Sequence, residues 1–156
     1  MNMEIIFRHV SASDPAVELS ISEHLREMSP TAPPESRHAL NSTQLGENHM
    51  TIFAGYLGGQ IAALGALRNL DKSRAELKSM RTAAAHRGRG LGRAMLERLI
   101  GHARATGISD LYLETGTHDH FIPARQLYAS AGFTVCEPFG SYAEDPHSVF
   151  MHRRLD

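Results

Sequence analysis

The most constraining feature of this chain is a run of glycine and arginine residues that leads directly into a helical pattern. Residues 86–93 are His-Arg-Gly-Arg-Gly-Leu-Gly-Arg. From there, apolar residues recur at four-residue spacing, at Leu91, Met95, Leu99 and Ala103. This spacing predicts an amphipathic helix that packs one face against a core, and Gly107 is a typical helix end.

The segment before the glycines, residues 75–85, is predicted to be a β-strand. A strand, a tight glycine turn and a helix N-terminus together form an anion site, because unpaired backbone N–H groups point at one spot and the helix dipole favours negative charge there. The arginines add charge-assisted hydrogen bonds suited to phosphate. The alternative interpretation is a glycine-rich surface turn that only begins an ordinary helix.

Known phosphate-binding patterns narrow the kind of anion. The P-loop pattern is absent, because no Lys-Ser or Lys-Thr pair follows the glycines. The dinucleotide pattern G-x-G-x-x-G fails as well, because Arg93 or Met95 stands where the last glycine is required. The pattern R-x-x-G-x-G does fit, as Arg87-Gly88-Arg89-Gly90-Leu91-Gly92. It resembles the acyl-coenzyme A pyrophosphate loop of the GNAT superfamily of N-acetyltransferases.

Composition limits the class of protein. The 156 residues carry a formal net charge of -1, which argues against a general nucleic-acid binder, whose affinity depends on many cationic contacts. The single cysteine, Cys136, excludes a disulfide framework and a cysteine-based metal cluster. No apolar run is long enough to span a membrane, and the N-terminus lacks a signal-peptide core. We therefore expect one cytoplasmic domain over residues 1–156 that binds neither nucleic acid nor membrane.

Strand patterns alternate with helical patterns along the chain. Strands are predicted at residues 4–10, 49–57, 60–70, 75–85, 109–116, 133–137 and 148–155, and helices at 15–29, 91–106 and 121–131. Gly58-Gly59 between two strands is a hairpin signal. The long helix would join neighbouring parallel strands, which is the crossover that parallel pairing requires. The order predicts a mixed sheet with helices on its faces, of the α/β or α+β class.

The central predicted strand contains an irregularity. Leu77 and Met80 have opposite parity, so in a regular strand they would face opposite sides of the sheet. A β-bulge between them would bring both into the core and splay the chain locally. The alternative is a strand buried on both faces, as in many parallel sheets.

The resemblance to the GNAT superfamily extends over nearly the whole chain. Residues 75–82 resemble its fourth strand, and residues 111–116, Leu-Tyr-Leu-Glu-Thr-Gly, resemble its fifth. Residues 123–128 with Gly132-Phe133 resemble its motif of an alanine four residues before a tyrosine, followed by Gly-Phe. Residues 139–151 are similar to the tail of one bacterial subgroup of small acetyltransferases.

The resemblance implies a GNAT-like enzyme that moves an acetyl group from acetyl-coenzyme A directly to the amine of a small-molecule or amino-acid-like acceptor, without a metal. It implies that the strand end and the glycine loop bind the cosubstrate, at Met80, Arg81, Thr82, Arg87, Gly88, Arg89, Gly90, Leu91, Gly92 and Arg93. A backbone N–H within residues 80–82 would hold the thioester oxygen, and the Tyr128 hydroxyl would protonate the thiolate leaving group.

Two departures from the family pattern concern the acceptor. The asparagine that often precedes the alanine–tyrosine motif is missing, and His120-Phe121-Ile122-Pro123 stands in that region. The central strand ends in Arg81-Thr82 rather than in an apolar residue. Both changes fall near the expected acceptor cleft, so they bear on the acceptor's identity more than on the fold.

Glu76 and Glu114 are the candidate bases, acting directly or through water, because each is a strand carboxylate next to the predicted cleft. The alternative for either is an exposed or ion-paired strand residue. Tyr128 has the alternative of a half-buried helix residue that anchors the core. Arg81 and the Arg37-His38 segment are predicted to line the acceptor side, where Arg81 would meet an acceptor carboxylate; its alternative is a surface position beside the pyrophosphate.

Two further features are interpreted as structural. His118-Asp119-His120 offers two imidazoles and one carboxylate with no fixed fourth ligand, so a polar loop near the acceptor entrance is favoured over a metal site. Cys136 is interpreted as a small core residue, because no histidine is spaced to pair with it as a nucleophile.

Other functional classes stay open at this point. A non-catalytic acyl-coenzyme A-binding sensor or interaction module could share the fold, since fold alone does not determine function. An acetyltransferase acting on a protein side chain or N-terminus is a third hypothesis. The sequence does not identify the acceptor, the base or whether the chain forms a homodimer.

Overall fold

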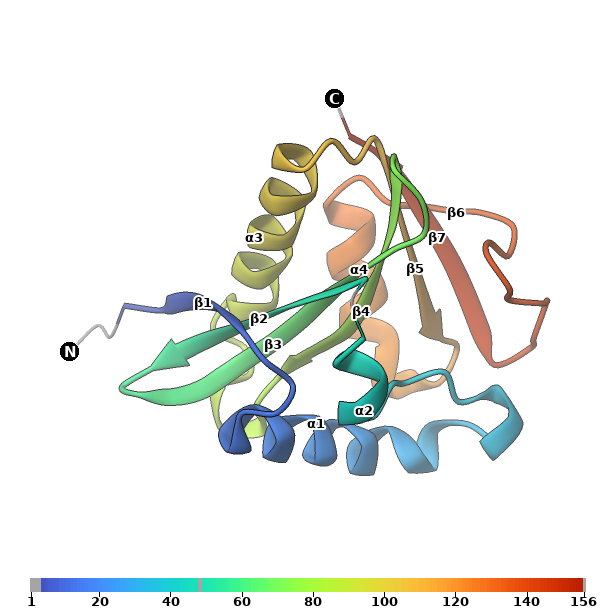
Figure 1. Cartoon of the computed structure of the whole chain (residues 1–156). Coiled ribbons are helices and arrows are strands. Elements are labelled where there is room, and N and C mark those ends of the chain that lie inside the picture. The colour runs from blue at the N-terminus through green and yellow to red at the C-terminus, as the bar shows by residue number, and fades with distance from the viewer. Residues whose placement is uncertain (1–3, 48, 156) are drawn as a thin grey trace.

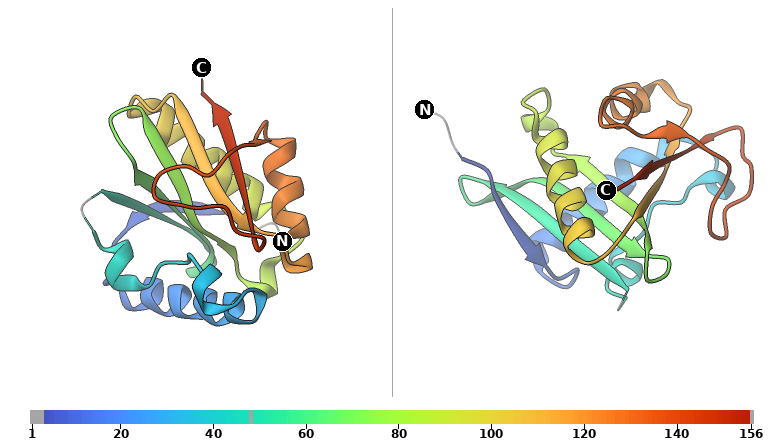
Figure 2. Two further views of the ribbon diagram at one scale, coloured as in Figure 1. Left: turned by 90° about the vertical axis from the view of Figure 1, so that its right-hand side faces the viewer. Right: turned by 90° about the horizontal axis from the view of Figure 1, so that it is seen from above.

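One mixed sheet forms the centre of the molecule (Figure 1, Figure 2). The computed structural model describes residues 4–47 and 49–155. The strand order is β1-β2-β3-β4-β5-β7-β6, and only β4 and β5 pair in parallel within these residues. The strands are β1 (Ile6–Val10), β2 (Met50–Leu57), β3 (Gln60–Asn69), β4 (Arg74–Thr82), β5 (Asp110–Gly116), β6 (Thr134–Val135) and β7 (Ser148–Arg154).

Helices cover both faces of this sheet (Figure 2). The α-helices are α1 (Pro15–Met28), α2 (Ser42–Leu45), α3 (Leu91–Ala105) and α4 (Ile122–Ser130), and short 3-10 turns are η1 (Ser29–Thr31), η2 (Pro34–Ser36), η3 (Ala84–His86) and η4 (Asp119–Phe121). One apolar core lies between the sheet and α3 and α4, and a second lies between the sheet and α1 and α2. In the described ranges, no helix is both long enough and apolar enough to cross a membrane.

The predicted helix boundaries are confirmed by their local chemistry. The Asp14 carboxylate caps α1 by accepting hydrogen bonds from the N–H groups of Ala16 at 3.0 Å and Val17 at 3.3 Å. On α3, the apolar positions that the spacing predicted are all buried, and the helix gives way to Gly107 in the left-handed region at φ 87°.

The central strand is shorter than the sequence predicted. We expected residues 75–85, but β4 ends at Thr82 and residues 84–86 form the turn η3. The last ladder pair with β3 joins Thr82 to Ala63, close to where β3 itself begins. Beyond that pair one more backbone bond, from the Ala83 N–H to the Ala62 carbonyl at 2.8 Å, continues the contact with β3, and the chain then turns, because alanine has a weak preference for strand structure.

The irregularity predicted in this strand is a β-bulge. Ser79 has a left-handed backbone with φ 56°, and the pairing with β3 shifts so that Ser79 and Met80 together lie opposite Gly65. Leu77 is buried in the core beneath α3, and Met80 packs against that same core, as the bulge hypothesis required. The alternative, a strand buried on both faces, applies only to the first half of β4, where residues 75–78 are all buried.

The bulge is accompanied by a separation of the two parallel strands. Pairing between β4 and β5 runs from Arg74 opposite Asp110 to Leu77 opposite Leu113, and then stops. Past that point the strands diverge, as Figure 1 shows. The crossover helix α3 begins shortly after the C-terminal end of β4. The gap between β4 and β5 and the N-terminus of α3 therefore border the same cavity.

We predict that Gly65→Ala destabilises the protein and that Gly101→Ala does not. A Cβ at Gly65 would lie 2.8 Å from Leu99 Cδ1, 2.9 Å from Met95 Cγ and 3.0 Å from Met80 Sδ, so it would overpack the core at the bulge, at a cost of about 1–3 kcal/mol. At Gly101, inside α3, a Cβ would meet nothing within 4 Å, so alanine should add about 0.5–1 kcal/mol of helix stability. Denaturant unfolding measures both; equal effects would contradict the packing argument.

Candidate active site

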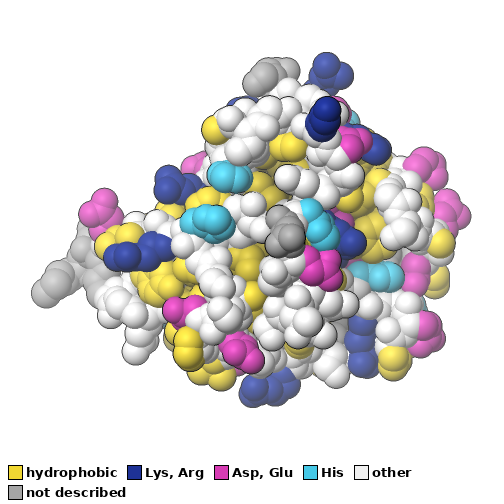
Figure 3. Space-filling view, viewed as in Figure 1, with side chains coloured by type: hydrophobic (Ala, Val, Ile, Leu, Met, Phe, Trp, Pro, Cys, Tyr) yellow, Lys and Arg dark blue, Asp and Glu magenta, His cyan; other side chains and the backbone are white. Residues whose placement is uncertain are grey.

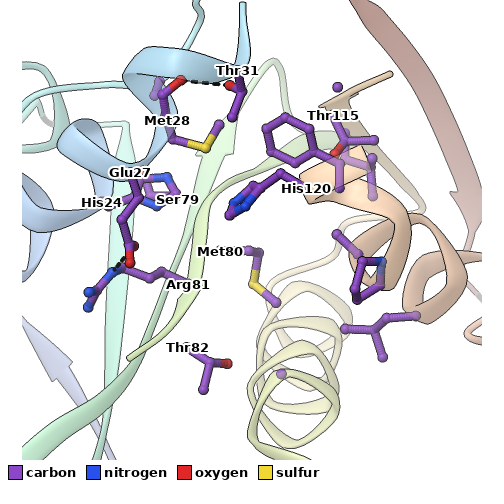
Figure 4. A pocket seen from close by; sticks show the side chains of 18 of the residues that line it. His24, Glu27, Met28, Thr31, Ser79, Met80, Arg81, Thr82, Thr115 and His120 are labelled. Carbon is purple, nitrogen blue, oxygen red and sulfur yellow. Dashed lines mark hydrogen bonds and ion pairs between the residues drawn. The ribbon is translucent and has the colours of Figure 1, made fainter. Parts of the chain in front are cut away.

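The diverging ends of β4 and β5 form the walls of a cavity of about 590 Å³. Its other walls come from α1 and the loop that follows it, from the glycine loop with the start of α3, and from η4 with the start of α4. In Figure 4, His24, Met80 and His120 reach the same space from three different elements. On the face seen in Figure 3, basic and acidic side chains are interspersed and form no single-sign stripe.

The glycine loop presents the backbone of Gly88 and Gly90 to this cavity. Gly88 and Gly90 both have φ 79°, a left-handed conformation that favours glycine, and a Cβ at either position would meet nothing within 4 Å. Gly90 caps α3, whose first N–H groups have no partner within the helix. Open space in front of unpaired N–H groups at a helix N-terminus suits a pyrophosphate.

The predicted cosubstrate residues divide into two groups. The members that line the cavity are Met80, Arg81, Thr82, Arg87, Gly88, Gly90, Leu91 and Gly92. Arg89 and Arg93 are not among the lining residues, and the Arg93 guanidinium instead donates to Ser130 Oγ on α4. The loop therefore presents one arginine, Arg87, to the cavity.

Arg81 lies in an ion-pair network with α1. Its guanidinium donates to Glu27 Oε1 at 2.9 Å and to Glu23 Oε2 at 3.1 Å, and its side chain is 8% exposed. Figure 4 shows the contact with Glu27. The other oxygen of Glu27 accepts from Arg87 at 2.9 Å. Burial raises the pKa of Glu27, but the two arginines outweigh it and hold that pKa below its ordinary value.

This network differs from both expectations for Arg81. The low exposure does not fit a surface arginine beside the pyrophosphate, and two carboxylates of α1 already satisfy the guanidinium edge that an acceptor carboxylate would use. The side chain holds α1 against the end of β4, where the cavity opens.

The two candidate bases lie in different environments. Glu114, on β5, lines the cavity, and burial raises the pKa of its carboxyl from 4.5 to about 7, against the opposing charge of Lys78. Glu76 is 1% exposed and is not among the lining residues. Its Oε2 accepts a hydrogen bond from the Tyr142 hydroxyl at 2.6 Å and lies 3.4 Å from Lys78 Nζ. Of the two, only Glu114 faces the space between the strands.

Tyr128 lies at the floor of the cavity on α4. It is 6% exposed, its ring packs edge-on against Phe133, and burial raises the pKa of its hydroxyl. No described residue forms a hydrogen bond with that hydroxyl. The packing interpretation therefore describes its ring, whereas its hydroxyl is free to contact a bound molecule.

Histidines from four separate segments line the cavity: His24, His38, His120 and His147. The sequence patterns indicated two of these regions, at His38 and His120, but not His24 or His147. His24 continues the buried row of Val17 and Ile21 on α1, so helical spacing could have placed it on this face. Burial, followed by the charge of Arg81, lowers the pKa of His24 to about 4, so its imidazole is neutral at pH 7.

The two loops at the far end of the cavity are tied together. Lys78 Nζ donates to the His38 carbonyl at 3.0 Å and to the Tyr142 hydroxyl at 2.8 Å. Ser36 Oγ donates to Asp145 Oδ2 at 2.6 Å. Lys78 and Tyr142 were not candidates from the sequence, since the resemblance assigned neither a role and they are 64 residues apart.

His118-Asp119-His120, where a polar loop was predicted in preference to a metal site, forms a turn. The N–H of His120 donates to His118 Nδ1 at 3.0 Å, which caps η4, and His120 lines the cavity. Among residues 4–47 and 49–155, no group of three or more His, Cys, Asp or Glu side chains is arranged to hold a metal ion. Cys136 is partly exposed on the chain after β6, so its interpretation as a core residue was wrong.

Together, a mixed sheet splayed at β4 and β5, a bulge, and a left-handed glycine loop at a helix N-terminus form one cavity suited to an anionic ligand. The sequence profile of the acetyltransferase (GNAT) family matches residues 18–133 of this chain. The chain therefore belongs to the GNAT family and is an N-acetyltransferase, as the motif resemblance implied.

Known proteins extend this assignment to nearly the full length. An uncharacterized N-acetyltransferase of Bacillus subtilis, YsnE, is 44% identical over 135 residues, covering 86% of this chain and 89% of that protein. A Klebsiella pneumoniae structure described as an acyl-CoA N-acyltransferase has a TM-score of 0.81 at 26% identity, covering 99% and 100% of the two chains. An Elizabethkingia anophelis acetyltransferase solved with acetyl-CoA bound has a TM-score of 0.72 at 16% identity, covering 97% and 98%.

The environment of Glu114 predicts a pH-dependent stability difference. A carboxyl whose pKa rises from 4.5 to about 7 on folding stabilises the protein fully below pH 4.5 and loses that contribution as the pH rises through 7. We expect the unfolding free energy of Glu114→Gln, relative to wild type, to rise by about 3 kcal/mol between roughly pH 4 and pH 8.5. Urea unfolding at both pH values tests this; a pH-independent difference would contradict the buried ionisation.

Proposed function

We propose that this enzyme transfers an acetyl group from acetyl-coenzyme A directly to the amine of a small molecule, with Glu114 as the base and Tyr128 as the acid. One observation carries the proposal. The left-handed glycine loop, the bulged end of β4, the Glu114 carboxyl and the Tyr128 hydroxyl all border the same cavity. Direct transfer needs an anion cradle, an oxyanion donor and two proton-transfer groups in one place.

The glycine loop supplies the anion cradle in this proposal. The N–H groups at the start of α3 would bind the pyrophosphate of acetyl-coenzyme A, helped by the helix dipole. Arg87 would add a charge-assisted hydrogen bond after exchanging Glu27 for a phosphate oxygen. The family's use of acetyl-coenzyme A supports this choice of cosubstrate.

The bulge supplies the oxyanion donor. Ser79 and Met80 are opposed by one residue of β3, which interrupts the regular ladder, and on the other side β5 has already separated. Within residues 80–82, a backbone N–H that points away from β3 has no β5 partner, and we assign it to the thioester oxygen, which gains negative charge when the amine attacks.

Glu114 and Tyr128 would move the two protons. The carboxylate of Glu114, directly or through a water molecule, accepts a proton from the attacking amine, and its pKa of about 7 suits this exchange near neutral pH. As the carbon–sulfur bond breaks, the sulfur takes a proton from the Tyr128 hydroxyl, which its raised pKa keeps protonated. Glu76 is a weaker candidate because Tyr142 and Lys78 already satisfy its buried carboxylate.

The acceptor end of the cavity favours a small molecule over a protein chain. The contacts of Lys78 and of Ser36 tie together the loop after α1 and the loop before β7 at this end. A protein segment would have to part these loops to reach Glu114, whereas a small amine would not. Measuring coenzyme A release from acetyl-coenzyme A with amines, polyamines, aminoglycosides and peptides tests this; activity confined to peptides would overturn it.

We predict that Gly90→Glu abolishes acetyl-coenzyme A binding. The new side chain would fill the phosphate space and oppose the phosphate charge. Gly107→Glu is the matched control, because Gly107 also has a left-handed backbone with nothing within 4 Å of a Cβ, at the other end of α3. Both variants should lose about 1–2 kcal/mol of stability from backbone strain. Calorimetry with acetyl-coenzyme A separates them, and unchanged affinity in folded Gly90→Glu would refute the cradle.

We predict that Tyr128→Phe lowers kcat by about 10²–10⁴-fold while acetyl-coenzyme A affinity stays close to wild type, because the variant keeps the ring but loses the proton donor. A purely structural tyrosine would instead keep its kcat, and its stability would change little, because its hydroxyl has no hydrogen-bond partner among the described residues. Tyr112→Phe is the control, since Tyr112 lies on β5 but is not among the cavity-lining residues. Thermal melts and steady-state rates on one preparation distinguish the two roles.

A further inference from the structure

The positive charges around the acceptor end of the cavity are nearly all neutralised by the protein itself. The cationic side chains that line the cavity are Arg37, Lys78, Arg81 and Arg87. An acceptor that carries a carboxylate beside its amine would need one of them, because a buried carboxylate without a partner loses its hydration and gains nothing in return. The partners of these cations therefore indicate which acceptors the site accepts.

The Lys78 ammonium is already held by two hydrogen bonds and one ion pair within the protein. An ammonium group has three N–H donors. Its neighbours are the His38 carbonyl at 3.0 Å, the Tyr142 hydroxyl at 2.8 Å and Glu76 Oε2 at 3.4 Å. The Lys78 side chain is 6% exposed and that of Glu76 is 2% exposed, so the pair is buried as a neutral unit.

Arg81 and Arg87 are balanced by α1. Glu27 contacts both guanidinium groups, and Glu23 contacts Arg81 a second time, so two carboxylates face two arginines. In the proposed function, Arg87 is also the arginine that pairs with the cosubstrate phosphate. Neither guanidinium is then left with an unbalanced charge beside the reacting amine.

Among the lining arginines and lysines that the structure describes, Arg37 is the one without a carboxylate partner. Arg37 is exposed, follows η2 in the loop after α1, and donates from Nε to the Ala32 carbonyl at 2.8 Å. Nearer the proposed reaction centre stand Glu114, which attracts an ammonium group and repels a carboxylate, and the neutral imidazole of His24.

We propose, on the basis of the function proposed above, that the acceptor is an amine with no carboxylate next to the reacting nitrogen, an alkylamine, arylalkylamine or polyamine rather than an α-amino acid. The site would select against that carboxylate because its cations are already paired within the protein and because Glu114 would repel a second negative charge. This replaces the expectation that Arg81 meets an acceptor carboxylate. An anionic group farther from the amine, where it could contact Arg37, is compatible with this proposal.

Matched acceptor pairs that differ only by the carboxylate test the inference. Tyramine and tyrosine, cadaverine and lysine, and agmatine and arginine form such pairs. We expect kcat/KM for coenzyme A release to favour the decarboxylated member by about 10- to 100-fold, the loss typical of a buried charge without a partner. A preference for the amino acids would overturn the inference and leave the proposed function standing. No release with any member would overturn both.

A variant on α1 tests the charge argument itself. Glu23→Gln should remove one of the two carboxylate charges that balance Arg81, and should reduce the preference for the amine in each pair by about three- to tenfold. Glu23 is 40% exposed, so the variant should fold. Glu18→Gln is the matched control, an exposed glutamate on the same helix, and should keep the wild-type ratio. An unchanged ratio in Glu23→Gln would overturn the inference.

Discussion

The left-handed turn at Ser79 is the constraint on which the rest of the site depends. A serine with positive φ is unfavourable by about 1–2 kcal/mol, so surrounding packing must hold it there. That packing comes from Met80, which seats against the core beneath α3, and from Gly65 opposite, whose missing side chain leaves the room. Because the extra residue redirects β4, the parallel pairing with β5 ends at Leu77 and the cavity opens beyond it.

The two ends of the cavity differ in the source of their positive charge. At the glycine loop, positive potential comes from backbone N–H groups that no side chain neutralises, and this end can accept an anion at little cost. At the other end, the cations are side chains and the protein supplies their counter-charges, through Glu76, Glu23 and Glu27. In the proposed function, this difference lets one cavity bind a polyanionic cosubstrate and an ammonium-bearing acceptor side by side.

Helix α1 connects these two ends. Glu27 touches Arg81 with one oxygen and Arg87 with the other, so the acceptor wall and the cosubstrate loop share one carboxylate.

Local patterns were enough to predict most of the fold. The four-residue spacing in α3, the Asp14-Pro15 start of α1 and the Gly58-Gly59 hairpin each act within a few residues of chain, so the sequence carries them directly. The strand limits were less certain: β4 ended three residues early, because where a strand ends depends on where its partner ends. The parity of Leu77 and Met80 indicated a bulge, but not that Ser79 would take the left-handed turn.

The sequence by itself determined the GNAT fold and the place of the glycine loop at the start of α3, because glycine backbone freedom and a helix N-terminus are local properties. Only the tertiary structure decided which charged side chains are buried and which partners they have. It placed Glu114 in the cavity and Glu76 behind it, paired Arg81 with α1, and brought His24 and His147 to one space from opposite ends of the chain. Burial and ion pairing depend on residues tens of positions apart, and no spacing in one chain can show which carboxylate meets which cation.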